Sequence, residues 1–133
     1  MLEDLGYKYP SREIHFTKYS HEKACADVFA ALAPSGYLQE WKAHKKLANG
    51  VIPDRTARIG DEVYHFEIEM GTKNDIDKKL RAYQSYNRTS GEKFHVFFLV
   101  TPNILDEGKR ALEHATKHYN VMLLDEFIAS PFG

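Results

Sequence analysis

The chain has 133 residues, enough for one domain, and its 43% hydrophobic and 28% charged residues are ordinary values for a globular protein, which excludes disorder as the default. A formal net charge of −1 argues against a dedicated nucleic-acid coat protein, because such proteins carry a basic excess. The longest apolar runs fall well short of the ~20 residues that span a bilayer, and no charged-then-apolar signal opens the chain. We therefore expect a cytoplasmic protein without a membrane partner.

The first predicted element is a helix that follows an extended arm. Residues 1–19 show weak periodicity and are predicted to form the arm, so that the single domain spans residues 20–133. Ser20 is a favourable N-cap, and Pro34 and Gly36 end the apolar pattern that follows it. The apolar residues at helical spacing are Ala24, Val28, Ala31 and Leu32. An amphipathic helix of about three to four turns is therefore predicted.

Three strands are predicted next. Aromatic and apolar positions alternate loosely with polar ones over residues 37–47, and the turn residues 48–50 follow. Two further runs, 51–59 and 62–70, are separated by Gly60-Asp61, a dipeptide that builds two-residue turns. We expect these two runs to form a β-hairpin.

The carboxyl-terminal half alternates helices and strands. Asn74 can cap a second helix, and residues 94–100 form a continuous apolar run that is typical of a strand buried on both faces. Apolar positions between 104 and 119 trace a third helix, and residues 121–124 a last short strand. The apolar stripe of the second helix is Ile76, Leu80 and Tyr83. Since strand–helix–strand units pair in parallel, the predicted fold is α/β, in the order αβββαβαβ, with a mixed sheet flanked by helices.

The predicted hairpin brings acidic residues together. Counting back from the turn at Gly60-Asp61, Asp54 pairs with Glu67, and Glu69 shares the face of Glu67. Facing like charges destabilise a sheet, and a bound cation would compensate for them. Hard ions such as Mg²⁺ or Mn²⁺ take carboxylate oxygens together with water and phosphate oxygens. The pattern favours a metal site; the alternative is a solvated acidic face neutralised by nearby lysine or arginine residues.

Basic residues are concentrated around this predicted site. Residues 41–58 carry a net charge of +4, whereas the rest of the chain sums to −5. A basic region suits a phosphate-bearing partner. The candidate DNA-binding residues are Lys42, Lys45, Lys46, Arg55, Arg58 and Lys78.

The acidic motif resembles that of a known group of nucleases. Pro53-Asp54, a short interval, and then Glu67-Ile68-Glu69 on an apolar strand resemble the signature of the PD-(D/E)XK superfamily, and the predicted element order is similar to its restriction-endonuclease-like core. More narrowly, residues 52–54 and 66–72, followed by Lys78-Lys79-Leu80, are similar to the replication-relaxation proteins of plasmids and other mobile elements. His21, Asp27, Trp41 and Tyr83 add to that likeness.

The resemblance implies a Mg²⁺- or Mn²⁺-dependent endonuclease, or a nicking or processing enzyme, that acts on DNA in the replication or transfer of a plasmid, phage or other mobile element. It implies that Asp54 and Glu67 are metal ligands, with the backbone carbonyl of Ile68 as a further ligand. DNA, a second copy of the chain and other replication proteins are the candidate partners.

One departure from the signature bears on catalysis. The signature's lysine would fall at position 69, where this chain has Glu69. Either Glu69 acts as an additional metal ligand, or Lys79 on the following helix brings its ammonium group into the vacant place; Lys79 as a solvated helix charge is a further alternative. Without a catalytic lysine, the chain would be a silent nuclease-fold module for DNA binding or assembly. The net charge also leaves open an interaction domain with no nucleic-acid role.

Several polar residues have both a functional and a structural interpretation. The resemblance implies that the first helix can supply another acid to the site, which would be Glu22 or Asp27; the alternative is that both are surface charges. His65 can orient water or contact phosphate, or be a hydrogen-bonded strand histidine. Tyr83, like Tyr86 and Trp41, can stack on bases or pack in the core. His114 and His118 have i, i+4 spacing but lack the glutamate of the H-E-x-x-H motif, so we expect no zinc site on that helix.

Overall fold

The computed structural model describes residues 12–70 and 76–132. The helices are α1 (Arg12–Leu32), α2 (Ile76–Ser90), α3 (Leu105–Ala111) and α4 (Leu124–Ala129), with 3-10 turns η1 (Ala33–Ser35) and η2 (Pro102–Ile104). The strands are β2 (Leu38–Ala43), β3 (Arg55–Ile59), β4 (Glu62–Glu69), β5 (His95–Val100) and β6 (Tyr119–Leu123). Among these described residues, no helix combines the length and the apolar character needed to cross a bilayer.

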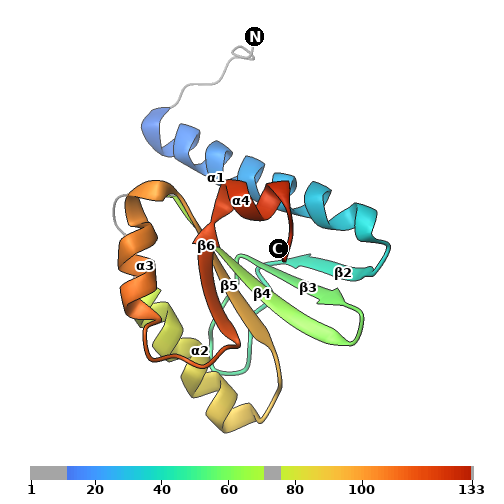
Figure 1. Cartoon of the computed structure of the whole chain (residues 1–133), viewed down its shortest axis with the longest axis vertical. Coiled ribbons are helices and arrows are strands. Elements are labelled where there is room, and N and C mark those ends of the chain that lie inside the picture. Colours follow the sequence, from blue (N-terminus) through green and yellow to red (C-terminus); the bar gives the residue numbers. More distant parts are fainter. Residues whose placement is uncertain (1–11, 71–75, 133) are drawn as a thin grey trace.

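A five-stranded sheet in the order β2-β3-β4-β5-β6 forms the centre of the fold (Figure 1). The pairs β2–β3 and β3–β4 are antiparallel, whereas β4–β5 and β5–β6 are parallel. The prediction of an α/β fold with a mixed sheet flanked by helices is therefore confirmed. Helices α2 and α3 connect the parallel strands and cover one face of the sheet, while α1 and α4 cover the other.

The β3–β4 hairpin has the register predicted from its turn residues. Ile59 pairs with Glu62 and Arg55 pairs with Phe66, with Gly60 at a φ of 63° in the turn. Glycine adopts this left-handed conformation without the steric cost that a side chain would bring. Because Asp54 immediately precedes Arg55, the register places it next to Glu67 at the end of the ladder.

Two hydrophobic cores lie on the two sides of the sheet. On the α1/α4 side, Phe66 and Ile68 of β4 pack with Val28 and Phe127. On the other side, buried residues of α2 such as Tyr83 pack against β5. The side chains of β4 alternate between these environments, as a strand requires, so Glu67 and Glu69 face α2. The predicted alternation is confirmed, and the apolar run 94–100 contains β5, an interior strand of the sheet.

The amino-terminal half differs from the prediction at the ends of its elements. Helix α1 begins at Arg12, so residues 12–19 are helical and not an extended arm, and Ser20 is not its N-cap. These residues contain neither proline nor glycine, so nothing in them stops a helix. Strands β2 and β3 are shorter than predicted, because residues 44–54 form a loop. Leu47 of this 44–54 loop is buried with the α2 core, and Asn49 Nδ2 donates to the carbonyl of Ala82.

The carboxyl-terminal half contains one helix more than predicted. Helix α3 ends at Ala111, so His114 and His118 do not share a helix, and β6 begins at Tyr119 rather than at residue 121. Helix α4 was not predicted, since its six residues are too few to show a period and they follow directly on an apolar run. The Asn74 cap falls outside the described residues.

Gly108 permits a close approach of α3 to its neighbours. A Cβ at this position would lie 2.7 Å from Val121 Cγ2 and 3.3 Å from Ile76 Cδ1. We expect Gly108→Ala to lower the free energy of unfolding by about 1–3 kcal/mol through overpacking, although alanine is the better helix former. Urea denaturation measures the change. Glu107→Ala, at an exposed position of the same helix, should stay within about 0.5 kcal/mol of the wild type, and a Gly108→Ala protein as stable as that control would contradict the packing argument.

Candidate metal centre

Three carboxylates meet at the end of the sheet where β4 ends and β3 begins. One oxygen from each of Asp54, Glu67 and Glu69 lies within 4.8 Å of the others. The hairpin register supplies Asp54, and the alternation of β4 supplies the two glutamates. The cluster that the sequence predicts is therefore present, and its separations are short enough for one divalent ion to contact all three residues.

The cluster is buried but reachable from solvent. Glu67 and Glu69 are 3% and 6% exposed, whereas the Asp54 side chain is 20% exposed. A pocket of about 300 Å³ opens beside Asp54 and Glu67. Its wall includes Ile52 from the 44–54 loop and Lys78 from α2. The carboxyl end of a parallel strand such as β4 is the usual place for a ligand in an open α/β sheet.

Asp54 is held in place by two hydrogen-bonding groups. Its Oδ2 atom accepts a hydrogen bond from the backbone N–H of Ile68 at 2.8 Å and lies 3.3 Å from His21 Nε2. Burial alone would raise the pKa of Asp54, but the bonds from His21 and Ile68 outweigh burial and the pKa is lowered. The hydrogen bond to Asp54 raises the pKa of His21 to about 10. Asp54 is therefore an ionised carboxylate with a fixed orientation.

The pKa values of the two glutamates, Glu67 and Glu69, are raised, in contrast to that of Asp54. Burial, followed by the charge of Asp54, raises the pKa of Glu67 to about 7. The Tyr83 hydroxyl donates to Glu67 Oε2 at 2.5 Å and partly offsets this cost. Burial also raises the pKa of Glu69, although Lys79 opposes it. A carboxylate buried at this level is costly unless a cation or a donor compensates it.

Lys79 on α2 supplies that compensation. Its Nζ atom lies 2.5 Å from Glu69 Oε2 and 3.4 Å from Glu67 Oε1. Burial alone would lower the pKa of Lys79, but the neighbouring carboxylates, Glu67 first, outweigh it and the pKa is raised. The structure thus places the Lys79 ammonium group beside Glu67 and Glu69, which is one of the alternatives that the sequence left open for this residue. Its role in catalysis remains a prediction.

The first helix contributes a histidine to the site, not a carboxylate. Glu22 pairs with Arg55 at 2.7 Å, and Asp27 pairs with Lys23 at 3.0 Å one helical turn away. Neither acid belongs to the cluster. His21, which the sequence suggested through its family likeness, is the α1 residue that reaches Asp54.

Arg55, which was predicted to contact DNA, has its side chain buried and paired within the domain. It is 7% exposed and donates both to Glu22 and to the backbone carbonyl of Asp54. Alternation along β3 turns its side chain toward α1, where it links helix and strand. The remaining basic candidates are exposed or half-buried: Lys42, Lys45, Lys46, Arg58 and Lys78.

The surroundings of His65 match the structural interpretation of this residue, since its side chain is buried among aromatic rings. Its ring packs against Tyr83 and Phe94 with centroid distances of 5.7 and 5.2 Å, and Nδ1 is 2.9 Å from the Thr56 hydroxyl. Burial lowers the pKa of His65 to about 4, so the ring is neutral at physiological pH. Trp41 likewise packs between other aromatic rings in the core of the α1 side.

Two parts of the site were not anticipated from the sequence. The 44–54 loop folds over α2, so that Val51 and Ile52 form one wall of the pocket. Tyr83 donates to Glu67 rather than offering its ring to a base. Leu47, an apolar residue in a polar segment, was the available signal that this loop packs against the domain.

Comparisons of this chain with protein-family models, with curated proteins and with solved structures give no match. The fold class is an α/β domain with a five-stranded mixed sheet flanked by helices. The site is a cluster of acidic residues that can hold a metal ion.

Tyr83 and Tyr86 offer a matched test of the buried carboxylate. Both are buried on α2 and donate to a glutamate, but Glu67 is buried whereas Glu92 is exposed. In metal-free buffer, we expect Tyr83→Phe to lower the free energy of unfolding by about 1–3 kcal/mol, because it leaves a buried charge with one donor fewer. Tyr86→Phe should cost less than about 1 kcal/mol, since water can replace its hydroxyl. Equal losses in chemical denaturation would show that Glu67 does not depend on this donor.

Metal binding is tested directly by calorimetric titration of Mn²⁺. The wild-type chain should bind the ion, and Glu67→Ala should weaken binding by about tenfold or more, because a carboxylate ligand is lost. Asp77→Ala removes an exposed acid on α2 that pairs with Arg81 and should leave the affinity unchanged. Equal Mn²⁺ affinity in wild type and Glu67→Ala would exclude the cluster as the metal centre.

Proposed function

We propose that this chain is a metal-dependent deoxyribonuclease with a restriction-endonuclease-like core. The observation that carries the proposal is the meeting of Asp54, Glu67, Glu69 and Lys79 beside an open pocket at the carboxyl end of β4. Oxygen ligands of this kind suit Mg²⁺ or Mn²⁺. A divalent ion held by them would supply the charge and the activated water that assist phosphodiester hydrolysis.

The residues divide between holding the metal and handling the substrate. Asp54 and Glu67 would be the principal ligands, with Glu69 or the Ile68 carbonyl as a further one. When bound, the metal supplies charge for the scissile phosphate and lowers the pKa of a water molecule. His21 and the Ile68 N–H keep Asp54 oriented toward the cluster.

We assign to Lys79 the role of contacting the scissile phosphate or the attacking water. Its ammonium group now neutralises Glu67 and Glu69, and a divalent ion would compete for the same oxygens. A lysine has three donors on a flexible stem, so Nζ can turn to a phosphate oxygen or to the attacking water without leaving the site. It would thereby take the position that the signature assigns to the lysine two residues after the acid.

The order of the elements supports the same superfamily. A helix, an antiparallel three-stranded meander, a helix and a parallel strand occur here as α1, β2–β4, α2 and β5. This order, with Asp54 immediately before β3 and Glu67 on β4, agrees with the PD-(D/E)XK likeness of the sequence. We extend the proposal to DNA processing in replication or transfer of a mobile element on the narrower likeness of residues 52–54 and 66–72.

The exposed lysines are the proposed contacts for the DNA backbone. Lys78 lines the pocket next to the cluster, and Lys45 and Lys46 lie on the 44–54 loop that forms its wall. Phosphate contacts by such residues are independent of sequence and weaken as salt rises. A second copy of the chain and other replication proteins remain candidate partners within this proposal.

A second candidate is a nuclease-fold module that binds DNA without cutting it. The observation in its favour is the Lys79–Glu69 pair, because the ammonium group already balances the charge that a metal ion would balance. In this case Glu69, at the position of the signature lysine, would make the cluster purely structural.

Plasmid cleavage tests the proposal. The tag-free chain with Mn²⁺ should nick or linearise supercoiled plasmid, and chelation should stop it. Asp54→Asn and Lys79→Met should each reduce the rate by ~100-fold or more, since each removes charge stabilisation worth several kcal/mol. Asp77→Asn and Arg81→Met, exposed residues on α2, are the matched controls and should cut like the wild type.

Fluorescence anisotropy with labelled duplex DNA separates the two candidates. Salt-dependent binding in EDTA, with no cleavage at any metal concentration, would favour the silent module over the nuclease. Absence of both binding and cleavage would reject both candidates in favour of an interaction domain without a nucleic-acid role.

A further inference from the structure

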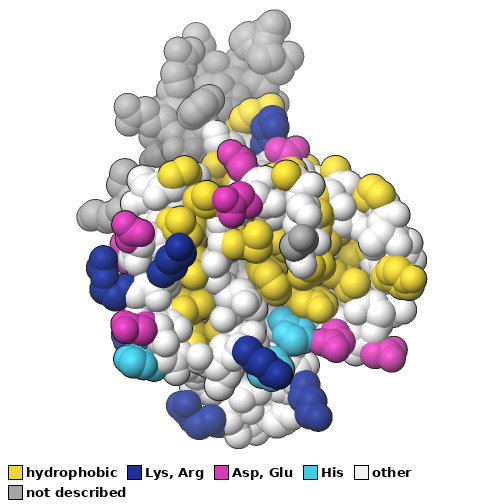
Figure 2. Space-filling model, viewed as in Figure 1, with side chains coloured by type: hydrophobic (Ala, Val, Ile, Leu, Met, Phe, Trp, Pro, Cys, Tyr) yellow, Lys and Arg dark blue, Asp and Glu magenta, His cyan; other side chains and the backbone are white. Residues whose placement is uncertain are grey.

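A second cluster of polar side chains lies at the opposite end of the sheet, where the parallel strands begin. A pocket of about 490 Å³ there is lined by residues of the β4, β5 and β6 starts, among them Glu62, His95 and His118. Figure 2 shows histidine, basic (lysine or arginine) and acidic side chains together in the lower part of the visible face. Because β4 runs from Glu62 to Glu69, the two sites are roughly 23 Å apart along one strand.

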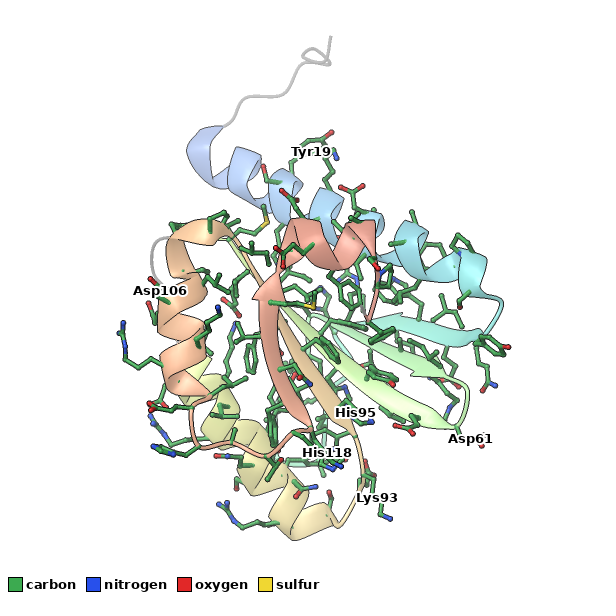
Figure 3. The ribbon with its side chains drawn as sticks, in the orientation of Figure 1. Tyr19, Asp61, Lys93, His95, Asp106 and His118 are labelled. Carbon is green, nitrogen blue, oxygen red and sulfur yellow. The ribbon has the colours of Figure 1, made fainter. Side chains whose placement is uncertain are left out.

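Strand register brings the two histidines together. Val96 pairs with Tyr119 in the parallel β5–β6 ladder, so His95 and His118 occupy the preceding position on each chain segment. The backbone N–H of Val96 donates to the His118 carbonyl at 2.9 Å and fixes that segment beside β5. The ring centroids are 5.1 Å apart, and the two side chains lie close to each other in Figure 3.

The proton positions on His95 follow from its partner. Its Nε2 atom is hydrogen bonded to Glu62, and since a carboxylate can only accept, Nε2 carries the hydrogen. In a neutral imidazole, Nδ1 then presents a lone pair. That atom accepts a hydrogen bond from His118 Nδ1 at 3.4 Å, and a metal ion bound between the two nitrogens would take the place of this hydrogen. A stacked contact with Tyr64, at a centroid distance of 4.7 Å, holds the His95 ring in this orientation.

This arrangement has the dimensions of a transition-metal site. Two nitrogen ligands at 2.0–2.1 Å from a tetrahedral zinc ion are about 3.3–3.4 Å apart, which is the spacing between the two Nδ1 atoms. A metal-bound histidine commonly donates its other N–H to a carboxylate, which is the role of Glu62 here. Imidazole nitrogens suit zinc and its neighbours, whereas Mg²⁺ and Mn²⁺ prefer the oxygens of the acidic cluster.

We propose that His95 and His118 bind a zinc ion, or a similar first-row transition-metal ion, through their Nδ1 atoms, with Glu62 orienting His95. The remaining coordination positions face the pocket and are taken by water or by a small anionic ligand. Lys93 and Lys117 at the pocket rim suit an anionic ligand by charge. The ion would join the beginnings of β5 and β6, and its site is separate from the Asp54 cluster.

The test uses calorimetric titration of Zn²⁺ into the full chain, free of any histidine tag, in a Glu67→Ala background that disables the acidic cluster. One ion per chain should bind. His118→Gln, at an exposed position, should weaken binding at least tenfold, and Glu62→Gln should weaken it about tenfold through loss of the orienting carboxylate. His114→Gln, four residues before His118 and also exposed, is the matched control and should bind like its parent.

Absorption spectroscopy with Co²⁺ gives a second measurement that does not rely on calorimetry. Co²⁺ at the same site should produce visible absorption bands that disappear in His118→Gln and in His95→Gln, while circular dichroism confirms that each variant is folded. Absence of Zn²⁺ binding in the parent, or undiminished binding in His118→Gln, would overturn the proposal. Because Mn²⁺ binding at the acidic cluster is measured separately, failure of one site leaves the other unaffected.

Discussion

The placement of Glu67 and Glu69 in the interior of the sheet's α2 side is the constraint around which this domain is organised. A buried carboxylate costs several kcal/mol unless donors or cations surround it, and two on one strand face repel each other as well. Helix α2 supplies both a donor and a cation, since Tyr83 and Lys79 lie on consecutive turns and contact the glutamates of β4. The helix is therefore fixed by polar contacts as well as by its apolar stripe, and its position determines the shape of the pocket.

Asp54 connects the acidic cluster to α1, which covers the other face of the sheet. It lies at the junction between the 44–54 loop and β3, with Ile68 from β4 and His21 from α1 as its partners. Its neighbour Arg55 connects β3 to Glu22 on the same helix. Helix α1, which otherwise belongs to the apolar core of the other face, is thus joined to the site by two polar contacts. Residues from helices on both faces of the sheet, α1 and α2, therefore contact the cluster.

The sequence was sufficient where local rules decide the structure. The Gly60-Asp61 turn determines the β3–β4 register, and from that register the meeting of Asp54 with Glu67 follows. Turn chemistry and the alternation of a strand operate within a few residues, so they can be read directly. The apolar stripe of α2 and the interior position of β5 were predictable for the same reason.

Contacts between distant segments were beyond those rules. The sequence left open whether Lys79 is a solvated charge or a partner of the cluster, because the answer depends on where α2 rests on the sheet. Arg55 lies in a basic stretch, but its burial depends on Glu22, 33 residues earlier. His118 meets His95 only through the parallel register of β5 and β6, whereas spacing along the chain had suggested a helical pair with His114.

The attachment of the 44–54 loop to α2 has a mechanical consequence. Asn49 is bonded to the carbonyl of Ala82, and Leu47 is embedded among the apolar residues of the same helix. The segment that ends at Asp54 and the helix that carries Lys79 are therefore held together by a side-chain hydrogen bond and by buried apolar contacts. Substitutions at Leu47 or Asn49 would weaken this attachment and so disturb the pocket wall formed by Val51 and Ile52, without changing any acidic residue of the cluster.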